Sequence, residues 1–432
     1  MFNWIDRFFG LQQNETTMKR EVTAGMIGFF TVVYIVVVNS LILSESGMPV
    51  EAAIVATIGA SVFGCLLMGF WGNVPILLIP GMGINALFSY TLVQSLGLSW
   101  QEALAVVFVS GVIFVAVAFT RFSGIISAAV PHSLKEAITV GLGLFLMLVG
   151  LEKGGIVEKG ASAILALGSL GEAQVLATVL TFLVAIVLFI RNVPGNFLIT
   201  IAVGTLIASL FGLIDFNQTD GGSLTASEAF GVFGAMSFGS LVSMTFWVAV
   251  FSLTMVLVFE NIGLVHGQMA FIGRPERYGR AFQATSIAAM ASGVFGTSPT
   301  VASVESTSGM VAGGRTGLPA VTAGLLFGLS AFFIPLIKLI PDSAIAPILI
   351  IIGSLMLQNI RNLDLQDMSE SFPALLIIAL IPFTYSIADG IAIGFILYPI
   401  LKIAVGKWRE VSVTLYVIAS LFLVNFVFHV IG

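Results

Sequence analysis

The stretch PTVASVESTSG, residues 299–309, places a glutamate, Glu305, inside a chain whose residues are 58% hydrophobic and only 9% charged. Soluble domains carry about 25% charged residues. Apolar runs of about 20 residues, which suffice to cross a bilayer as helices, recur from residue 22 to residue 431. The sequence therefore predicts an all-α polytopic membrane protein, in which a carboxylate at the depth of Glu305 needs a physical reason.

The apolar runs give the predicted segments of the chain. Residues 1–21 contain acidic residues and are followed by an apolar run of full spanning length, so we interpret them as a cytoplasmic interfacial segment and not as a signal peptide. The division at 387/388 and the role of the last run as a span stay open. The predicted segments are 22–44, 51–71, 76–96, 101–120, 133–152, 173–190, 196–214, 242–265, 279–296, 298–316, 319–340, 343–360, 371–387, 388–406 and 411–431.

Basic residues indicate how these segments are oriented. With the N-terminus in the cytoplasm, Lys153, Lys159 and Lys338 fall outside, and the other 14 of the 17 lysines and arginines fall inside. Cytoplasmic loops of membrane proteins are enriched in these two residues. The connection at 215–241 carries acidic residues but no lysine or arginine, as expected of an external loop. The sequence therefore predicts a cytoplasmic N-terminus.

The external loop divides the chain into two blocks, 22–214 and 242–406, with a C-terminal apolar segment at 407–432. Seven segments in each block force the second block to be inverted relative to the first. Inverted repeats are typical of secondary transporters, whose substrate site lies near the middle of the membrane between the repeats. The arrangement therefore predicts a transporter of about 14 segments.

Polar residues recur at matching places in the two blocks. In the first block, Asn39 and Asn85 lie 46 positions apart in the first and third segments. In the second block, Glu260 and Glu305 lie 45 positions apart in the corresponding segments. This spacing suggests one composite site built from both blocks.

Both third segments contain residues that break helices. PILLIPGMGINALFSY (75–90) has Pro80, Gly81 and Gly83 just before Asn85, and FGTSPTVASVESTSGMVAGG (295–314) has glycine, proline and serines around Glu305. Proline and glycine disfavour helices, and the freed backbone groups must face protein or a water-filled cavity. Such breaks would suit a binding site for a polar solute. The alternative is that the glycines serve close packing of helices.

Glu260, in VLVFENIGL, and Glu305 are the two carboxylates that we place well inside apolar segments. Ionisable groups at this depth normally face an interior path. A carboxylate accepts hydrogen bonds from N–H groups. Burial favours its neutral, protonated form, so a buried carboxylate can also carry a proton. The pair therefore fits a flat heterocycle with ring N–H groups, a proton-coupling step, or both, and fits an inorganic anion poorly. The alternative is a structural, protonated glutamic acid.

Other features narrow the possible functions. The single cysteine excludes a disulfide within the chain, and the three scattered histidines make a structural metal site improbable. We find no phosphate-binding glycine loop, no His-Glu-x-x-His motif and no nucleophile elbow. We therefore expect no cofactor, no metal, no nucleic-acid partner and no enzymatic activity. A channel remains a weaker alternative, since a pore does not require acids in both blocks.

Four motifs resemble one family: PGMGINALFSY, VFENIG, GTSPTVASVESTSGMVAGGRTGLPAV and SESFPALLIIALIPFTYSIADGIAIGF. The chain resembles, from about Phe8 to its C-terminus, the AzgA-like purine permeases of the second nucleobase–cation symporter family, within the xanthine/uracil permease superfamily. The resemblance implies fourteen segments in two inverted repeats, core and gate domains, and short extended stretches in the third and tenth segments. It also implies import of adenine, guanine or hypoxanthine with protons across the cell membrane, often by a homodimer.

The resemblance also implies roles for particular residues. Glu260 and Glu305 would bind the edge of the base and couple its import to protons, and Asn85 would be the polar partner in the third segment. The residues expected to line the base through backbone groups are Ile84, Ser303 and Val304.

The chain departs from the pattern of purine permeases at several positions. FENIGLV replaces the usual "FD" followed by a Gly-Thr-Leu step, Leu257 replaces an Asp or Asn, and Pro299 replaces a Ser or Thr. The Glu-Asn-Ile-Gly run resembles the uracil and xanthine branch. A uracil or xanthine permease is therefore the main alternative, and an anion exchanger or channel on the same fold is a further one.

Overall fold

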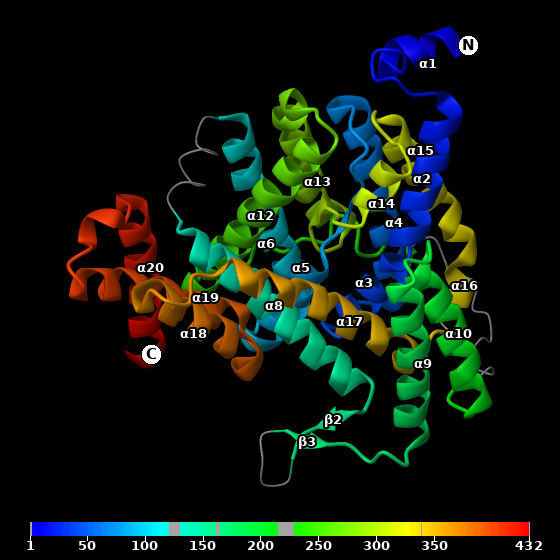
Figure 1. Cartoon of the computed structure of the whole chain (residues 1–432). Helices are drawn as coiled ribbons and strands as arrows, with labels where there is room; N and C mark the ends of the chain where they lie inside the picture. Colours follow the sequence, from blue (N-terminus) through cyan, green and yellow to red (C-terminus); the bar gives the residue numbers. More distant parts are fainter. Residues whose placement is uncertain (1, 121–129, 161–164, 215–228, 338, 432) are drawn as a thin grey trace.

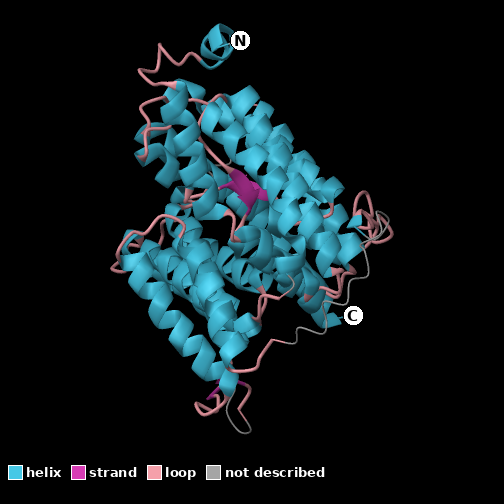
Figure 2. Cartoon of the chain, turned by 90° about the vertical axis from the view of Figure 1, so that its right-hand side faces the viewer, coloured by secondary structure: helices cyan, strands magenta, loops and turns pink. Residues whose placement is uncertain are grey.

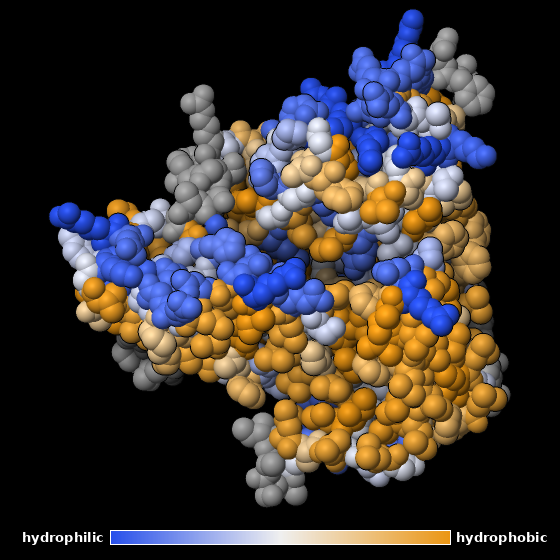
Figure 3. Space-filling model, in the orientation of Figure 1, coloured by the Kyte–Doolittle hydropathy of each residue, from blue (hydrophilic) through white to orange (hydrophobic). Residues whose placement is uncertain are grey.

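The computed structural model describes residues 2–120, 130–160, 165–214, 229–337 and 339–431 (Figure 1). About 74% of the chain is helical, and in the described ranges nine helices are long and apolar enough to cross a membrane. Figure 3 shows a broad apolar surface over α9 and α10, where Leu183, Ile190 and Leu210 are exposed. The expected class, an all-α polytopic membrane protein, is confirmed.

The elements follow the predicted apolar runs closely. The first half contains α1 (Phe2–Phe9), α2 (Met18–Val32), α3 (Ile35–Ser44), α4 (Val50–Leu67), β1 (Leu78–Pro80), α5 (Met82–Ala86), α6 (Trp100–Phe119), α8 (His132–Lys153), β2 (Val157–Glu158), β3 (Ala166–Leu167), α9 (Ala173–Ile190) and α10 (Asn196–Leu210). The second half contains α12 (Met244–Phe271), α13 (Tyr278–Phe295), β4 (Thr300–Ala302), α14 (Ser306–Val311), α15 (Leu318–Ser330), α16 (Ile334–Ile337), α17 (Asp342–Leu357), α18 (Met368–Thr384), α19 (Ile387–Ala404) and α20 (Val413–Ile431).

A few boundaries differ from those expected. The helix expected to end at residue 265 continues to Phe271 in α12. The uncertain division at 387/388 corresponds to a turn, in which Tyr385 has a φ of 54°, between α18 and α19. The last apolar run forms α20, which packs against α19 and α12. Residues 215–228 of the expected external loop, and Lys338, lie outside the described residues.

The helices pack in two groups. The core group consists of α2, α3, α4, α6, α12, α13, α14 and α15, and the gate group consists of α8, α9, α10, α17, α18 and α19; within each group the helices contact one another extensively. In Figure 1, α8, α17 and α18 run obliquely below the core group. The strands β1 and β4 lie within the core group, so the core group contains the segments that the sequence marked as broken.

Local sequence explains where the elements near the strands begin and end. Ser243 caps α12 by accepting the N–H of Phe246. Gly296 ends α13 with a φ of 87°, a conformation that glycine adopts without strain. A Cβ at this position would also lie 2.5 Å from the carbonyl oxygen of Val232. The chain therefore leaves α13 at Gly296 and enters β4 in an extended conformation.

A buried carboxylate that the sequence analysis did not single out holds together the end of the core group where α2 begins. Glu21, at the start of α2, is fully buried and accepts bonds from the N–H of Arg315 (2.9 Å) and from the N–H (3.0 Å) and hydroxyl (2.6 Å) of Thr316. Arg274 donates to the carbonyls of Asn73 (3.1 Å) and Arg315 (2.8 Å). These bonds join α2, the segment that follows α12, the chain at Asn73 and the turn between α14 and α15.

We expect Glu21→Gln to lower the free energy of unfolding by about 1–3 kcal/mol, because the amide nitrogen cannot accept the N–H or O–H groups that Glu21 accepts. Thermal unfolding of the purified protein in detergent measures this effect. Glu172, at the N-terminus of α9, is exposed. Glu172→Gln is therefore the matched control and should not shift the unfolding temperature. Equal unfolding temperatures for Glu21→Gln and the wild type would contradict a structural role for Glu21.

Candidate functional site

The two broken segments meet in a short antiparallel strand pair (Figure 2). Leu78 pairs with Ala302, Ile79 with Val301, and Pro80 with Thr300. Backbone groups freed from helices in a membrane need partners within the protein, and each strand provides them for the other. The expected extended stretches in the third and tenth segments are therefore confirmed, and their antiparallel pairing agrees with an inverted relation between the two blocks.

Further backbone bonds extend the strand pair at both ends. The N–H of Gly81 donates to the carbonyl of Pro299 (3.3 Å), and the N–H of Ser303 donates to the carbonyl of Leu77 (3.1 Å). A short helix follows each strand, α5 after β1 and α14 after β4. The side chains that begin these helices are thereby held beside the strand crossing.

Glu305 lies in the turn between β4 and α14 and is half-buried. Its Oε1 accepts a bond from the hydroxyl of Tyr34 (2.9 Å), and its Oε2 accepts one from the hydroxyl of Ser303 (2.5 Å). Each oxygen retains a lone pair for a further donor. The geometry therefore holds Glu305 in place as a hydrogen-bond acceptor.

Glu260 lies near the middle of α12, which packs against β4 and α5. Glu305 follows β4, so the contact between α12 and β4 brings both carboxylates to the same part of the core group. Its Oε2 is buried and has no hydrogen-bond partner among the described residues. Because a buried polar atom without a partner is destabilising, this oxygen is available for a proton or for a donor from a ligand.

The other expected site residues lie around the same strand crossing. Asn85, in α5, is fully buried; its Oδ1 has no partner in the described part of the chain, and its Nδ2 lies 3.8 Å from the sulfur of Met82. Ile84 is also fully buried, and Val304 is 60% exposed. The backbone N–H and carbonyl of Ser303 are engaged by Leu77 and Gln268. Each of these residues therefore lies within a few positions of one of the two paired strands.

Three residues that the sequence analysis did not single out support the site. Tyr34 lies in an interruption between α2 and α3, within an apolar run that gave no signal. Asn261 accepts the N–H of Ala302 (3.0 Å), and Gln268 donates to the carbonyl of Ser303 (2.6 Å). Asn261 and Gln268 are seven positions apart, so they lie on one face of α12. This spacing was a signal available in the sequence.

Asn39, which the sequence paired with Asn85, has a structural role. Its Nδ2 donates to the hydroxyl oxygens of Thr57 (2.8 Å) and Thr297 (3.0 Å), and its Oδ1 accepts from Ser298 (2.9 Å). These bonds fasten the chain just before β4 to α3 and α4. Of these two asparagines, Asn85 and not Asn39 has a side-chain oxygen without a partner in the described residues.

One face of α12 next to Glu260 is open. A Cβ placed on Gly263 or Gly267 would meet no atom within 4 Å. His266, two turns after Glu260, is exposed, and its ring lies 5.8 Å from that of Tyr278. This geometry supports an interfacial histidine, and within the described ranges it gives no contact for a proton relay to Glu260.

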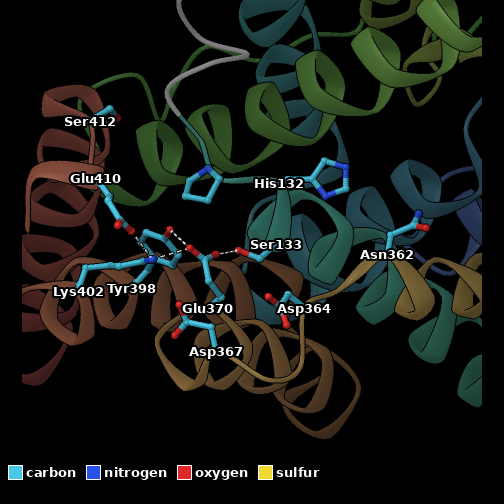
Figure 4. A pocket seen from close by; sticks show the side chains of 11 residues that line it. His132, Ser133, Asn362, Asp364, Asp367, Glu370, Tyr398, Lys402, Glu410 and Ser412 are labelled. Atoms are coloured by element: carbon cyan, nitrogen blue, oxygen red, sulfur yellow. Dashed lines mark hydrogen bonds and ion pairs between the residues drawn. The ribbon is translucent and has the colours of Figure 1, made fainter. Parts of the chain in front are cut away.

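A cavity of about 530 Å³ lies apart from the strand crossing, at the ends of α8, α18 and α19 (Figure 4). Glu370 accepts bonds there from Ser133 (2.5 Å), Tyr398 (2.6 Å) and Lys402 (2.7 Å), and Lys402 also contacts Glu410 (2.9 Å). Every one of these side chains has a partner. The cluster joins helices of the gate group and does not touch the two carboxylates of the candidate site.

Comparisons with known proteins agree with this arrangement. Residues 19–393 match the model of a permease family, Xan_ur_permease. The nucleobase transporter PlAzg2 of Paenibacillus larvae is 48% identical over 381 residues, which are 88% of this chain and 76% of that protein. The guanine/hypoxanthine permease PbuO of Bacillus subtilis is 38% identical over 427 residues, which are 96% of this chain and 99% of that protein.

A solved structure shares the fold at low sequence identity. The transmembrane domain of a cyanobacterium bicarbonate transporter, BicA, matches with a TM-score of 0.66 and 14% identity, over 87% of this chain and 97% of that chain. At this identity the likeness concerns the fold alone. It confirms the expected helical membrane fold.

Proposed function

Since the chain belongs to the permease family that its residues 19–393 match, we propose that it imports purine nucleobases, namely adenine, guanine or hypoxanthine, by symport with protons. The protein is a transporter and not an enzyme, because both its family and its relatives are transporters. The names of two relatives, a nucleobase transporter and a guanine/hypoxanthine permease, support the substrate class.

The observation that carries the proposal is the set of acceptor atoms beside the strand crossing. Glu260 and Asn85 each present a buried oxygen without a partner in the described residues, and Glu305 lies in the turn that follows β4. Purine bases present ring N–H groups, and adenine and guanine add an amino group. Acceptors of this kind pair with such an edge, and Ile84, Ser303 and Val304 would line the rest of the base.

The same acceptors weigh against an anion as substrate. BicA, whose fold is similar, is a bicarbonate transporter. Two carboxylates near one another would repel an anion, because like charges at short range in a medium of low polarity interact strongly. Uracil and xanthine also present ring N–H groups, so a permease for those bases is the alternative that competition experiments distinguish.

In the proposed mechanism, the base binds between the broken third and tenth segments, and the site opens alternately to the two sides of the membrane. Glu260 and Glu305 both bind the base and couple its movement to protons. We place the protein in the cell membrane with a cytoplasmic N-terminus, because the lysines and arginines concentrate on that side. We propose a homodimer as the assembly.

Uptake of labelled hypoxanthine by cells that lack their own permeases tests the function. We expect uptake that an uncoupler abolishes and that excess unlabelled adenine, guanine or hypoxanthine reduces. Stronger competition by uracil or xanthine than by the three purines named above would indicate a uracil or xanthine permease instead. Uptake equal to that of cells carrying an empty vector, with no competition by any base, would contradict nucleobase transport.

A further inference from the structure

The side chain of Tyr34 contacts both groups of helices. Tyr34 is fully buried, and its hydroxyl donates to Oε1 of Glu305 (2.9 Å) in the core group. Its ring packs edge to face against Phe197 of α10, with 5.0 Å between the ring centroids and an interplanar angle of 66°. Phe197 is 4% exposed and belongs to the gate group. One residue thus joins the proposed substrate carboxylate to a gate helix.

The two ends of this link differ in how firmly they are held. On the core side, α2 and α14 are fastened by a second bond, from the hydroxyl of Ser308 to that of Thr31 (3.1 Å). They also approach closely at Gly309, where a Cβ would lie 2.9 Å from the carbonyl oxygen of Ala24. On the gate side, Tyr34 makes no hydrogen bond to α10 among the described residues and contacts it through the ring of Phe197. A shift of α10 past α2 must therefore break or reorient that ring contact.

We propose that Tyr34 is a positioning residue that couples the state of Glu305 to the movement of α10. The proposal rests on the proposed function, since it takes Glu305 as the carboxylate that binds the base. A hydrogen bond to a charged carboxylate is about twice as strong as one between neutral groups. Tyr34 is therefore held firmly while Glu305 is charged and free of ligand. A proton on Glu305, or a base N–H that shares its oxygen, weakens this bond and releases the ring from Phe197.

The first test separates binding from transport with Tyr34→Phe, which keeps the ring and removes the hydroxyl. We expect the Kd of the purified protein for hypoxanthine to stay within about threefold of the wild type, and the maximal uptake rate to fall about tenfold, the effect of about 1.4 kcal/mol. Thr31→Val removes a hydroxyl from the same contact between α2 and α14 without touching Glu305. This control should leave both quantities close to those of the wild type.

The second test removes the other end of the link with Phe197→Leu. We expect the same loss of maximal uptake with little change in Kd. The double variant should be no slower than either single variant, because both substitutions break one link and their effects are then not additive. Phe327→Leu is the control: Phe327 packs edge to face against Phe29 of α2 at 5.2 Å, but both residues belong to the core group. It should not change the uptake rate.

The outcomes separate this proposal from the proposed function. If the wild type binds no base, the proposed function fails first. If the wild type binds and imports a base, additive effects of the two substitutions would overturn the link, and so would an equal loss of binding and uptake in Tyr34→Phe. If Tyr34→Phe does not fold, as judged by thermal unfolding, Phe197→Leu decides alone: an uptake rate equal to that of Phe327→Leu would refute the coupling.

Discussion

In cells producing Glu305→Gln, we expect the uptake of labelled hypoxanthine to fall by about two orders of magnitude or more, which corresponds to about 3 kcal/mol of lost binding and transport free energy. Both oxygens of Glu305 accept bonds from hydroxyl groups, those of Tyr34 and Ser303. Glutamine replaces one oxygen with an amide nitrogen that donates, so one hydroxyl loses its acceptor. The variant also lacks the charge that strengthens a bond from a base N–H; hydrogen bonds to charged groups contribute about 1.5–3 kcal/mol each.

The measurement needs a control for expression and a control for the removal of charge. Glu276→Gln removes a carboxylate that is 64% exposed in the short turn of helix after α12, Pro275–Arg277, and should transport normally. The amount of each variant in the membrane is measured by immunoblotting. Loss of a hydrogen bond to a charged group that binds the base should reduce uptake by far more than threefold. Uptake by Glu305→Gln within about threefold of the wild type, at equal expression, would therefore indicate that Glu305 has a structural role.

Glu260→Gln should have a different effect, because Glu260 and Glu305 have different surroundings. Oε2 of Glu260 has no partner in the described residues, so it can take and release a proton without breaking a protein hydrogen bond. Glutamine has nearly the same shape but cannot lose or gain this proton. We therefore expect the variant to exchange bases across the membrane without accumulating them.

Proteoliposomes with an imposed pH gradient, acidic outside, measure this prediction. The wild type should accumulate hypoxanthine, and its uptake should decline as the external pH rises, because the carboxyl group must be protonated from that side. In Glu260→Gln, the accumulation ratio should approach unity, the rate should be nearly independent of pH, and counterflow should persist. Accumulation that still follows the pH gradient would assign proton coupling elsewhere, with Glu305 as the first candidate.

The sequence was informative about the carboxylates because an ionisable group in an apolar segment is rare and costs free energy to bury. Glu260 and Glu305 therefore stood out, and the proline and glycine residues around Asn85 and Glu305 predicted where helices give way to extended chain. The structure has β1 and β4 at those places, with Glu305 in the turn after β4 and Glu260 in α12, which packs against β4. Local composition was sufficient for these features because each depends on residues close together in the chain.

Features that depend on distant contacts were not predictable in the same way. Tyr34 lies within an apolar run and has no polar neighbour that would mark it. Its hydroxyl reaches Glu305, 271 positions away, only through the fold. Asn39 looked equivalent to Asn85, yet its three hydrogen bonds go to Thr57, Thr297 and Ser298. Glu21 lies at the end of an apolar segment, where a charged side chain is usually exposed to solvent. In the structure it is buried by the turn at Arg315 and Thr316. In each case the partner, and hence the role, is set by three-dimensional packing.

The strand pair limits how the site can open. Backbone bonds from β1 to β4, and from Gly81 to Pro299 and Ser303 to Leu77, join the two halves of the chain at the site itself. Parting the halves would leave these groups unpaired away from water, at several kcal/mol for each group. A jaw-like opening between the halves is therefore too costly. In the proposed mechanism we therefore expect the site to move as one unit. We expect sliding at contacts such as that between Tyr34 and Phe197, where two rings can separate without leaving a backbone group unpaired.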